Sequence, residues 1–214
     1  MNVVFNSRRR AQAHVLALHF RYMLSEKQFC DRARTELRVI GAQVLSLATD
    51  RDIYWKLERE IIEPNPRLHG TRSAFVDMLR GAYADALSAR VLRLLDSAGG
   101  GDSLLRVLSQ LGDYPQLLHN KITDREFADD RKALQQAASD LERVLQPHFA
   151  HHERTLPALA AVHRALDQAI DLLISTLKTY YWIIAEGYLP LDIQYAEDPL
   201  AIFRFAWSAS ETET

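Results

Sequence analysis

Residues 157–186 read PALAAVHRALDQAIDLLISTLKTYYWIIAE, and their pattern indicates the fold class. Its apolar residues recur every three or four positions, the period of one face of an α-helix. They form a stripe at Leu159, Val162, Leu166, Ile170, Leu173, Ile174, Leu177 and Tyr181. The stretch therefore predicts a long amphipathic helix. We expect that helix to end at Gly187, because glycine is favoured just after a helix C-terminus.

Helix signals also recur on the N-terminal side of this stretch. Ser25–Gln28 and Thr123–Glu126 have the pattern of capping boxes, in which each end residue bonds the backbone of the other. Asp50 and Asp102 are candidate N-caps. Together with breaks at proline and glycine clusters, these signals predict further helices over about 7–24, 25–49, 50–62, 72–95, 102–111 and 123–145. The helix over 72–95 is rich in small residues, which favours packing on several sides.

Composition supports the same fold class. The chain has 214 residues, with 31 Leu and 27 Ala against 10 Val and 11 Ile, and only 15 Gly and Pro together. Leucine and alanine favour helices, whereas β-branched residues favour strands. Few turn residues argue against a many-stranded sandwich or barrel. We therefore predict a single-domain, all-α helical bundle, followed from Tyr188 by an irregular tail docked on the core.

The distribution of charged residues and the cysteine content indicate where in the cell the protein is found. The longest stretch without Asp, Glu, Lys or Arg is Val39–Thr49, which is too short to span a bilayer. No signal-peptide cleavage site follows the N-terminal arginines, and the one cysteine, Cys30, excludes a disulfide framework. We therefore expect a cytoplasmic protein that does not contact a membrane.

The two halves of the chain carry opposite charge. Residues 1–107 hold 17 Lys and Arg against 12 Asp and Glu, and residues 108–214 hold 9 against 16. Of the 26 basic residues, 21 are Arg, whose planar guanidinium suits bidentate phosphate or carboxylate pairing. This pattern is compatible with salt-bridged helix surfaces, with a nucleic-acid face, or with self-association.

Three histidines, His148, His151 and His152, form a cluster that could carry chemistry. They lack the His-Glu-x-x-His pattern of a zinc site, and we expect no metal or other cofactor. Arg143 and His148 are separated by four residues, a spacing that can bring a cation and a base to one scissile phosphate. The histidine would take the proton of a ribose 2′-hydroxyl, and the arginine would stabilise the charged transition state.

Arg90, Arg93 and Asp96 lie at intervals of three residues and so near one face of the 72–95 helix. One interpretation is an ion pair between Arg93 and Asp96. The other is a pair of arginines, Arg90 and Arg93, that binds RNA phosphate.

Several stretches together resemble a known family, the HEPN-like domains, and in particular their abortive-infection branch, Abi-U. The resemblance spans about residues 35–207. It is carried by Asp50–Leu57 before a proline loop, by Ala74–Asp96 with the glycine loop and Ser103–Leu108, by Ala150–Arg154, and by Lys178–Tyr181 with the tail Ile202–Trp207.

The resemblance implies a dimeric all-α bundle. Active members of the family cut RNA without a metal, using an Arg and a His at the dimer interface, and commonly act as toxins or in antiphage defence. Other members are inactive and serve as binding or scaffold modules. A homodimer, an RNA substrate and a cognate antitoxin or defence partner are therefore implied for this chain.

The chain departs from the family pattern at the catalytic motif. The family stretch usually reads Arg-Asn-Lys, two residues, then Ala-His. Aligning Ala150-His151 with Ala-His places Leu145 where Arg is expected. Pairing Arg143 with His148 restores the spacing but places Pro147 inside the motif.

These patterns lead to one preferred function and one alternative. We predict an RNA-cleaving or RNA-binding protein of a prokaryotic defence or toxin system, with His151 or His148 as base, Arg143 and Arg154 as phosphate ligands, and His152 as an RNA contact. The alternative is a catalytically degenerate, dimeric interaction module. The expected division is a helical extension over 1–34, the HEPN-like domain over 35–207 and a disordered tail over 208–214.

Overall fold

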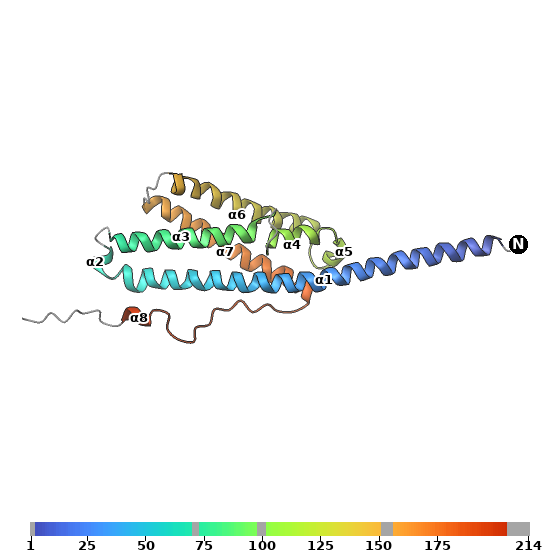
Figure 1. Ribbon diagram of the computed structural model, residues 1–214, viewed down its shortest axis with the longest axis horizontal. Helices are drawn as coiled ribbons and strands as arrows, with labels where there is room; N and C mark the ends of the chain where they lie inside the picture. Colours follow the sequence, from blue (N-terminus) through green and yellow to red (C-terminus); the bar gives the residue numbers. More distant parts are fainter. Residues whose placement is uncertain (1–2, 70–72, 98–101, 151–155, 205–214) are drawn as a thin grey trace, which may run out of the picture.

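The computed structural model describes the backbone of residues 3–69, 73–97, 102–150 and 156–204 (Figure 1). These residues contain helices and no strand, so the predicted all-α fold is confirmed. In chain order the elements are α1 (Val3–Leu57), the π-helix η1 (Glu58–Ile62), α2 (Pro66–His69), α3 (Ala74–Leu95), α4 (Leu104–Leu111), α5 (Pro115–Leu118), α6 (Asp124–Ala150), α7 (Leu156–Ala185) and α8 (Ala201–Arg204).

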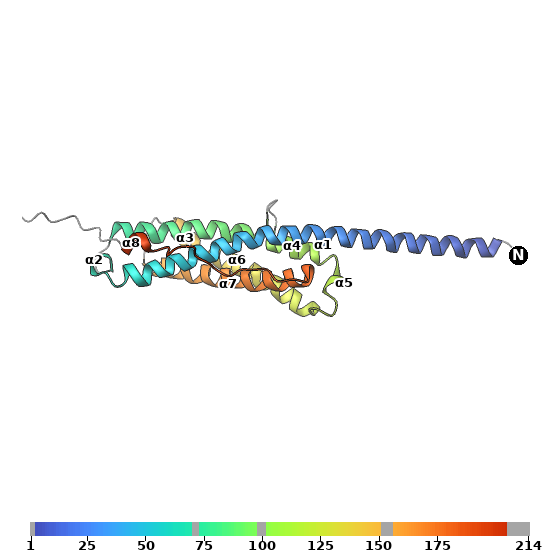
Figure 2. The same ribbon diagram turned by 90° about the horizontal axis from the view of Figure 1, so that it is seen from below.

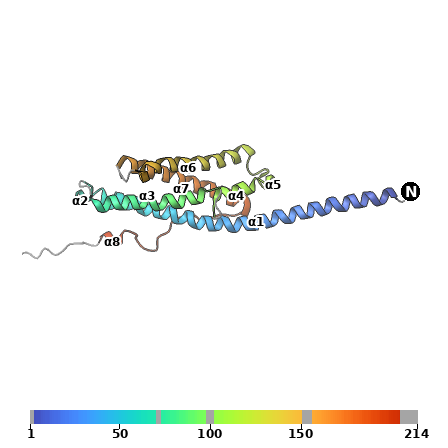
Figure 3. The same ribbon diagram turned by 45° about the horizontal axis from the view of Figure 1, so that its top comes forward.

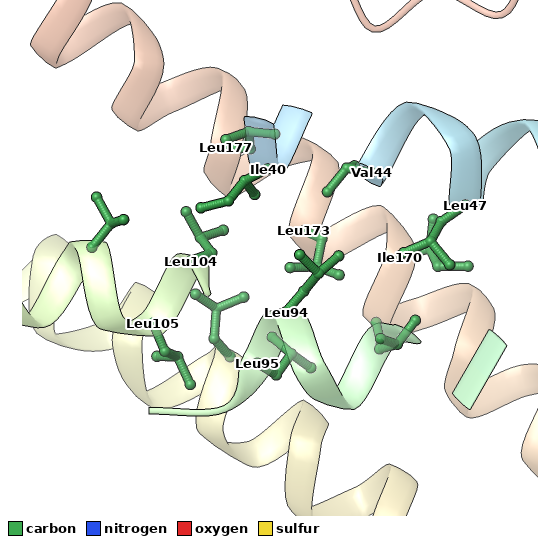
Figure 4. Packing of buried hydrophobic residues seen from close by; sticks show 14 of the residues in the cluster. Ile40, Val44, Leu47, Leu94, Leu95, Leu104, Leu105, Ile170, Leu173 and Leu177 are labelled. Carbon is green, nitrogen blue, oxygen red and sulfur yellow. The ribbon is translucent and has the colours of Figure 1, made fainter. Parts of the chain in front are cut away.

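Helix α7 lies at the centre of the bundle. It packs against α1, α3 and α6, and the four helices run side by side (Figures 1 and 3). All eight residues of the predicted stripe are buried in the main core or packed against it. Figure 4 shows part of this core, where buried side chains from four helices pack together: α1 (Ile40, Val44, Leu47), α3 (Leu94, Leu95), α4 (Leu104, Leu105) and α7 (Ile170, Leu173, Leu177).

Helix α1 is continuous where the sequence predicted three separate helices. The predicted starts at Ser25 and Asp50 both lie inside it, so these two predictions are wrong. No proline and only one glycine, Gly41, occur between Val3 and Leu57, so nothing ends the preceding helix at either position. The N-terminal part of α1 extends beyond the rest of the bundle (Figures 1 and 2).

Gly41 sits inside α1 because the C-terminal tail crosses there. A Cβ atom at this position would lie 2.9 Å from Cδ2 of Leu189. Glycine weakens a helix interior by about 1 kcal/mol relative to alanine, and here the close approach of the tail offsets that cost. The predicted docking of the tail is confirmed over the described residues, since Leu189, Leu191 and Leu200 are buried.

The ends of α6 and α7 fit the predictions in part. The Thr123–Glu126 capping box is confirmed: the Thr123 amide donates to the Glu126 carboxylate at 2.8 Å, and the Glu126 amide donates to Oγ1 of Thr123 at 3.2 Å. Helix α6 continues past Pro147 to Ala150. Helix α7 ends at Ala185, and Glu186 rather than Gly187 takes the left-handed conformation, with φ of 51°.

The caps of α3 and α4 are both serines. Ser73 accepts the amide of Val76, and Ser103 accepts the amide of Arg106. Ser103, not the predicted Asp102, is therefore the N-cap of α4. Its hydroxyl also donates to the carbonyl of Leu94, which ties α4 to the end of α3. Helix α3 packs against α1, α4, α6 and α7, so its predicted packing on several sides is confirmed.

The predicted domain boundary at residue 34 falls within α1. Phe29 and Ala33 already belong to the main core, so the bundle includes residues that precede 35. The proposed disordered tail, 208–214, lies outside the described residues. Within the described part of the chain, no helix is both long and apolar enough to cross a membrane.

The two capping-box patterns give a direct test of this fold. Thr123→Ala should lower the free energy of unfolding by about 1 kcal/mol, because it removes a real N-cap. Ser25→Ala, in the same pattern but inside α1, should change it by less than about 0.5 kcal/mol. Urea denaturation followed by circular dichroism measures both values. Equal losses would indicate that a helix does begin at residue 25.

Candidate functional site

A groove between α1 and α3 contains Arg90 and Arg93, the two arginines predicted to bind RNA phosphate. Its volume is about 390 Å³, and it is lined by Val39, Ala42, Gln43, Ser46, Leu47, Arg90, Arg93 and Leu94. The three α3 residues lie within one and a half helical turns, and the α1 residues repeat at intervals of three and four. The prediction that Arg90 and Arg93 share a face is confirmed.

The two arginines are held across this groove in different ways. Arg90 forms an ion pair with Asp50, and its other terminal nitrogen donates to Oγ of Ser46 at 2.8 Å. Arg93 donates to the side-chain carbonyl of Gln43 at 2.7 Å. Arg90 is thus neutralised by a carboxylate. The hydrogen-bond acceptor of Arg93 is instead a neutral amide, whose own nitrogen donates to Asp102 at 3.2 Å.

Arg143 is exposed on the surface of α6. Its guanidinium donates to Asp140 at 2.7 Å, an i,i+3 pair within the same helix. Its side chain is 75% exposed, so the pair contributes little to stability. The position leaves Arg143 accessible to a ligand, but with a carboxylate already bound to it.

The other predicted site residues cannot be placed against Arg143. His148 lies in the last turn of the α6 backbone, and its side chain is outside the described part. His151, His152 and Arg154 fall in 151–155, also outside the described residues. The predicted pairing of Arg143 or Arg154 with a histidine therefore stays a prediction. Among the described residues, no group of three or more His, Cys, Asp or Glu could hold a metal ion.

A buried polar cluster lies at one end of the bundle, and sequence reasoning missed it. Arg80 of α3 binds Glu58 of η1 through two nitrogens, at 2.7 and 2.8 Å. The hydroxyl of Tyr54 donates to the same carboxylate at 3.0 Å and lies 3.4 Å from Nδ1 of His163. Tyr83 stacks on Tyr54 with ring centroids 3.7 Å apart. The cluster therefore ties α1, η1, α3 and α7 together.

Glu58 enters the core by ordinary helical spacing, at the residue where the π-helix begins. It lies four residues after Tyr54 and next to Leu57, and all three side chains are buried. Glu58 is only 4% exposed. Burial alone would raise the pKa of its carboxyl group, but the hydrogen bonds from Arg80 and Tyr54 outweigh burial, and the pKa lies below its ordinary value. Glu58 is therefore a buried carboxylate anion.

The cluster lies close to the start of α7, because His163 comes about two turns after that start. The side chains of the cluster are largely buried, so its role is to fix the ends of the helices. One sequence signal could have found it: His163 interrupts the apolar stripe between Val162 and Leu166.

Known proteins offer no guide to this site. Models of known protein families, curated proteins and solved structures were each compared with the chain, and none of them matches it.

The ion pair of Glu58 makes a testable prediction about pH. Glu58→Gln keeps the shape of the side chain but removes the charge that Arg80 binds, and should lower the free energy of unfolding by about 2 kcal/mol at pH 7. Because the folded-state pKa of Glu58 is lowered, its stabilisation is complete above the unfolded pKa of about 4.3 and is lost as pH falls through the folded pKa.

The measurement is chemical denaturation of both proteins from pH 7 to pH 3. The difference in stability between wild type and Glu58→Gln should be constant above about pH 5 and should shrink below about pH 4. A difference that is the same at pH 3 and pH 7 would contradict a charged Glu58 in the core.

Proposed function

We propose that this protein binds RNA through the groove between α1 and α3. The observation that carries the proposal is Arg93, a guanidinium in a groove whose partner among the described residues is the amide of Gln43. A phosphate oxygen can replace that amide at little cost, because a charge-assisted hydrogen bond is stronger than a neutral one. Arg90 lies beside it, held by Asp50 and Ser46.

The distribution of charge supports this groove over other surfaces. Both helices that form it belong to residues 1–107, the half of the chain with a formal charge of +5. Phosphate contacts from Arg and Lys supply most of the sequence-independent affinity for nucleic acid. Val39 and Ala42, the exposed apolar residues of the groove lining, offer a surface on which bases can lie.

The proposal extends to cleavage through the resemblance to HEPN-like domains. In that reading the segment from Arg143 to Arg154 supplies a metal-independent endoribonuclease site. His151 is the general base, with His148 second, and Arg143 and Arg154 hold the scissile phosphate while His152 contacts the RNA. The protein would act as a homodimer in the cytoplasm of a prokaryote, as part of a toxin–antitoxin or antiviral defence system. Its cognate antitoxin or another defence protein would then be a partner.

A second candidate function is that of a catalytically inactive interaction module. Arg143 is already bound to Asp140, which disfavours a phosphate ligand there. Phe75 and Met78 are 53% and 55% exposed one turn apart on α3, an apolar surface that a partner protein could cover. A homodimer is expected under both functions.

The groove proposal predicts a difference between two arginine variants. Arg93→Gln should weaken binding of single-stranded RNA about five- to ten-fold and reduce the salt slope by about one phosphate contact. Arg125→Gln removes the same charge from an exposed site on α6, and should have little effect. Fluorescence anisotropy of labelled RNA at several salt concentrations measures both. An equal loss of RNA affinity in the two variants would contradict RNA binding in the groove.

The cleavage proposal is tested separately. Purified protein incubated with total RNA in EDTA should yield fragments that end in a 2′,3′-cyclic phosphate. His151→Ala should reduce cleavage about 10²- to 10⁴-fold without a change in melting temperature, since a positioned base is worth that much. His119→Ala, at an exposed histidine after α5, is the matched control. No cleavage by the wild type would favour the interaction module.

A further inference from the structure

A second cleft lies on the opposite flank of α1 from the arginine groove, between α1 and the C-terminal tail. Its volume is about 390 Å³, and its lining is Ala48, Arg51, Asp52, Trp55, Arg59 and Ile193. The four α1 residues and Arg59 of η1 recur at intervals of three and four, so they form one strip of the helix surface. Ile193 supplies the opposite wall. A volume of this size is within the range of small-molecule sites.

The tail is fixed where it closes this cleft. The hydroxyl of Tyr195 donates to Asp52 at 2.8 Å, and Nζ of Lys56 lies 4.4 Å from the centre of the Tyr195 ring. Nearby, Leu189 packs against Gly41. The wall that carries Ile193 is therefore held by contacts on either side of it, and the cleft is preformed.

Three basic side chains lie at or beside the cleft, and Arg59 differs from the other two in its partner. Lys56 pairs with Asp52 at 2.9 Å, and Arg51 pairs with Asp171 at 2.6 Å. Arg59 instead donates from Nε to the backbone carbonyl of Trp55 at 3.1 Å. Its two terminal nitrogens have no hydrogen-bond partner within the part of the chain that the structure describes. This fork of donors suits a phosphate group.

Trp55 gives the cleft a rigid aromatic wall. Its indole N–H donates to Asp167 at 3.2 Å, and its ring meets His163 edge to face at a centroid distance of 6.0 Å. The ring is half-buried, so part of its surface lines the cleft. A fixed indole beside an arginine matches the way proteins hold a base and its phosphate, by stacking and by charge.

We propose that this cleft binds a single phosphorylated nucleotide, with the base against Trp55 and the phosphate on Arg59. Ile193 covers the base from the side of the tail. A free nucleotide and the phosphorylated 5′ end of an RNA strand present this same chemistry. This proposal does not require RNA binding at Arg90 and Arg93, since the two sites lie on opposite flanks of α1.

The test uses the fluorescence of Trp55 in the full chain. Trp182→Phe and Trp207→Phe remove the other two tryptophans, so the emission reports this cleft alone. Adenosine 5′-monophosphate should quench it saturably, and about ten-fold more tightly than adenosine or inorganic phosphate. Arg59→Gln should weaken this binding about ten-fold, and Arg125→Gln should not.

Each outcome of the titration decides between named alternatives. Tighter binding of a 5′-phosphorylated RNA oligonucleotide than of adenosine 5′-monophosphate would identify the ligand as an RNA end, and equal or weaker binding would identify it as the free nucleotide. Inorganic phosphate binding as tightly as the nucleotide would overturn the role of Trp55. Absence of saturable quenching would overturn the proposal, even if Arg93 proves essential for RNA binding. Circular dichroism of Arg59→Gln checks that the bundle is intact.

Discussion

Burial of the apolar stripe of α7 is the constraint on which the rest of the structure depends. Thirty residues of helix with a continuous apolar face need neighbours along their whole length, and α1, α3 and α6 supply them. Tyr180 illustrates how completely α7 is enclosed: its side chain is fully buried, and its hydroxyl donates to Asp130 at 2.9 Å. Once α7 is enclosed, the ends of the other helices are fixed relative to it, and so are the surfaces that remain for function.

The most consequential neighbour is α1. Its side toward α3 forms one wall of the groove with Arg90 and Arg93, and its side toward the tail forms the cleft with Trp55, which Arg59 of η1 also lines. The buried cluster around Glu58 lies between these two flanks and ties α1 to α3 and α7. We infer that α1 positions two separate candidate sites. The ion pair between Glu58 and Arg80 holds α3 in place against the end of α1.

Local patterns in the sequence were enough to predict part of this arrangement. The stripe of α7, the capping box at Thr123 and the shared face of Arg90 and Arg93 all depend on residues close together in the chain, and all three are observed. The box at Ser25 failed because a capping pattern starts a helix only where the previous one ends. The pairing of Glu58 with Arg80 could not be predicted, because it joins residues from different helices. The tail contact at Gly41 was missed for a related reason, since Leu189 is far along the chain.

Photo-crosslinking is the most decisive test of the proposal that RNA binds between α1 and α3. Single-stranded RNA that contains 4-thiouridine is irradiated with the wild-type protein, and the crosslinked peptides are located by mass spectrometry. We expect crosslinks within residues 39–47 and 90–94, with or without further crosslinks within 148–154. Crosslinks confined to other surfaces, such as the exposed face of α6 around Arg125, would contradict it.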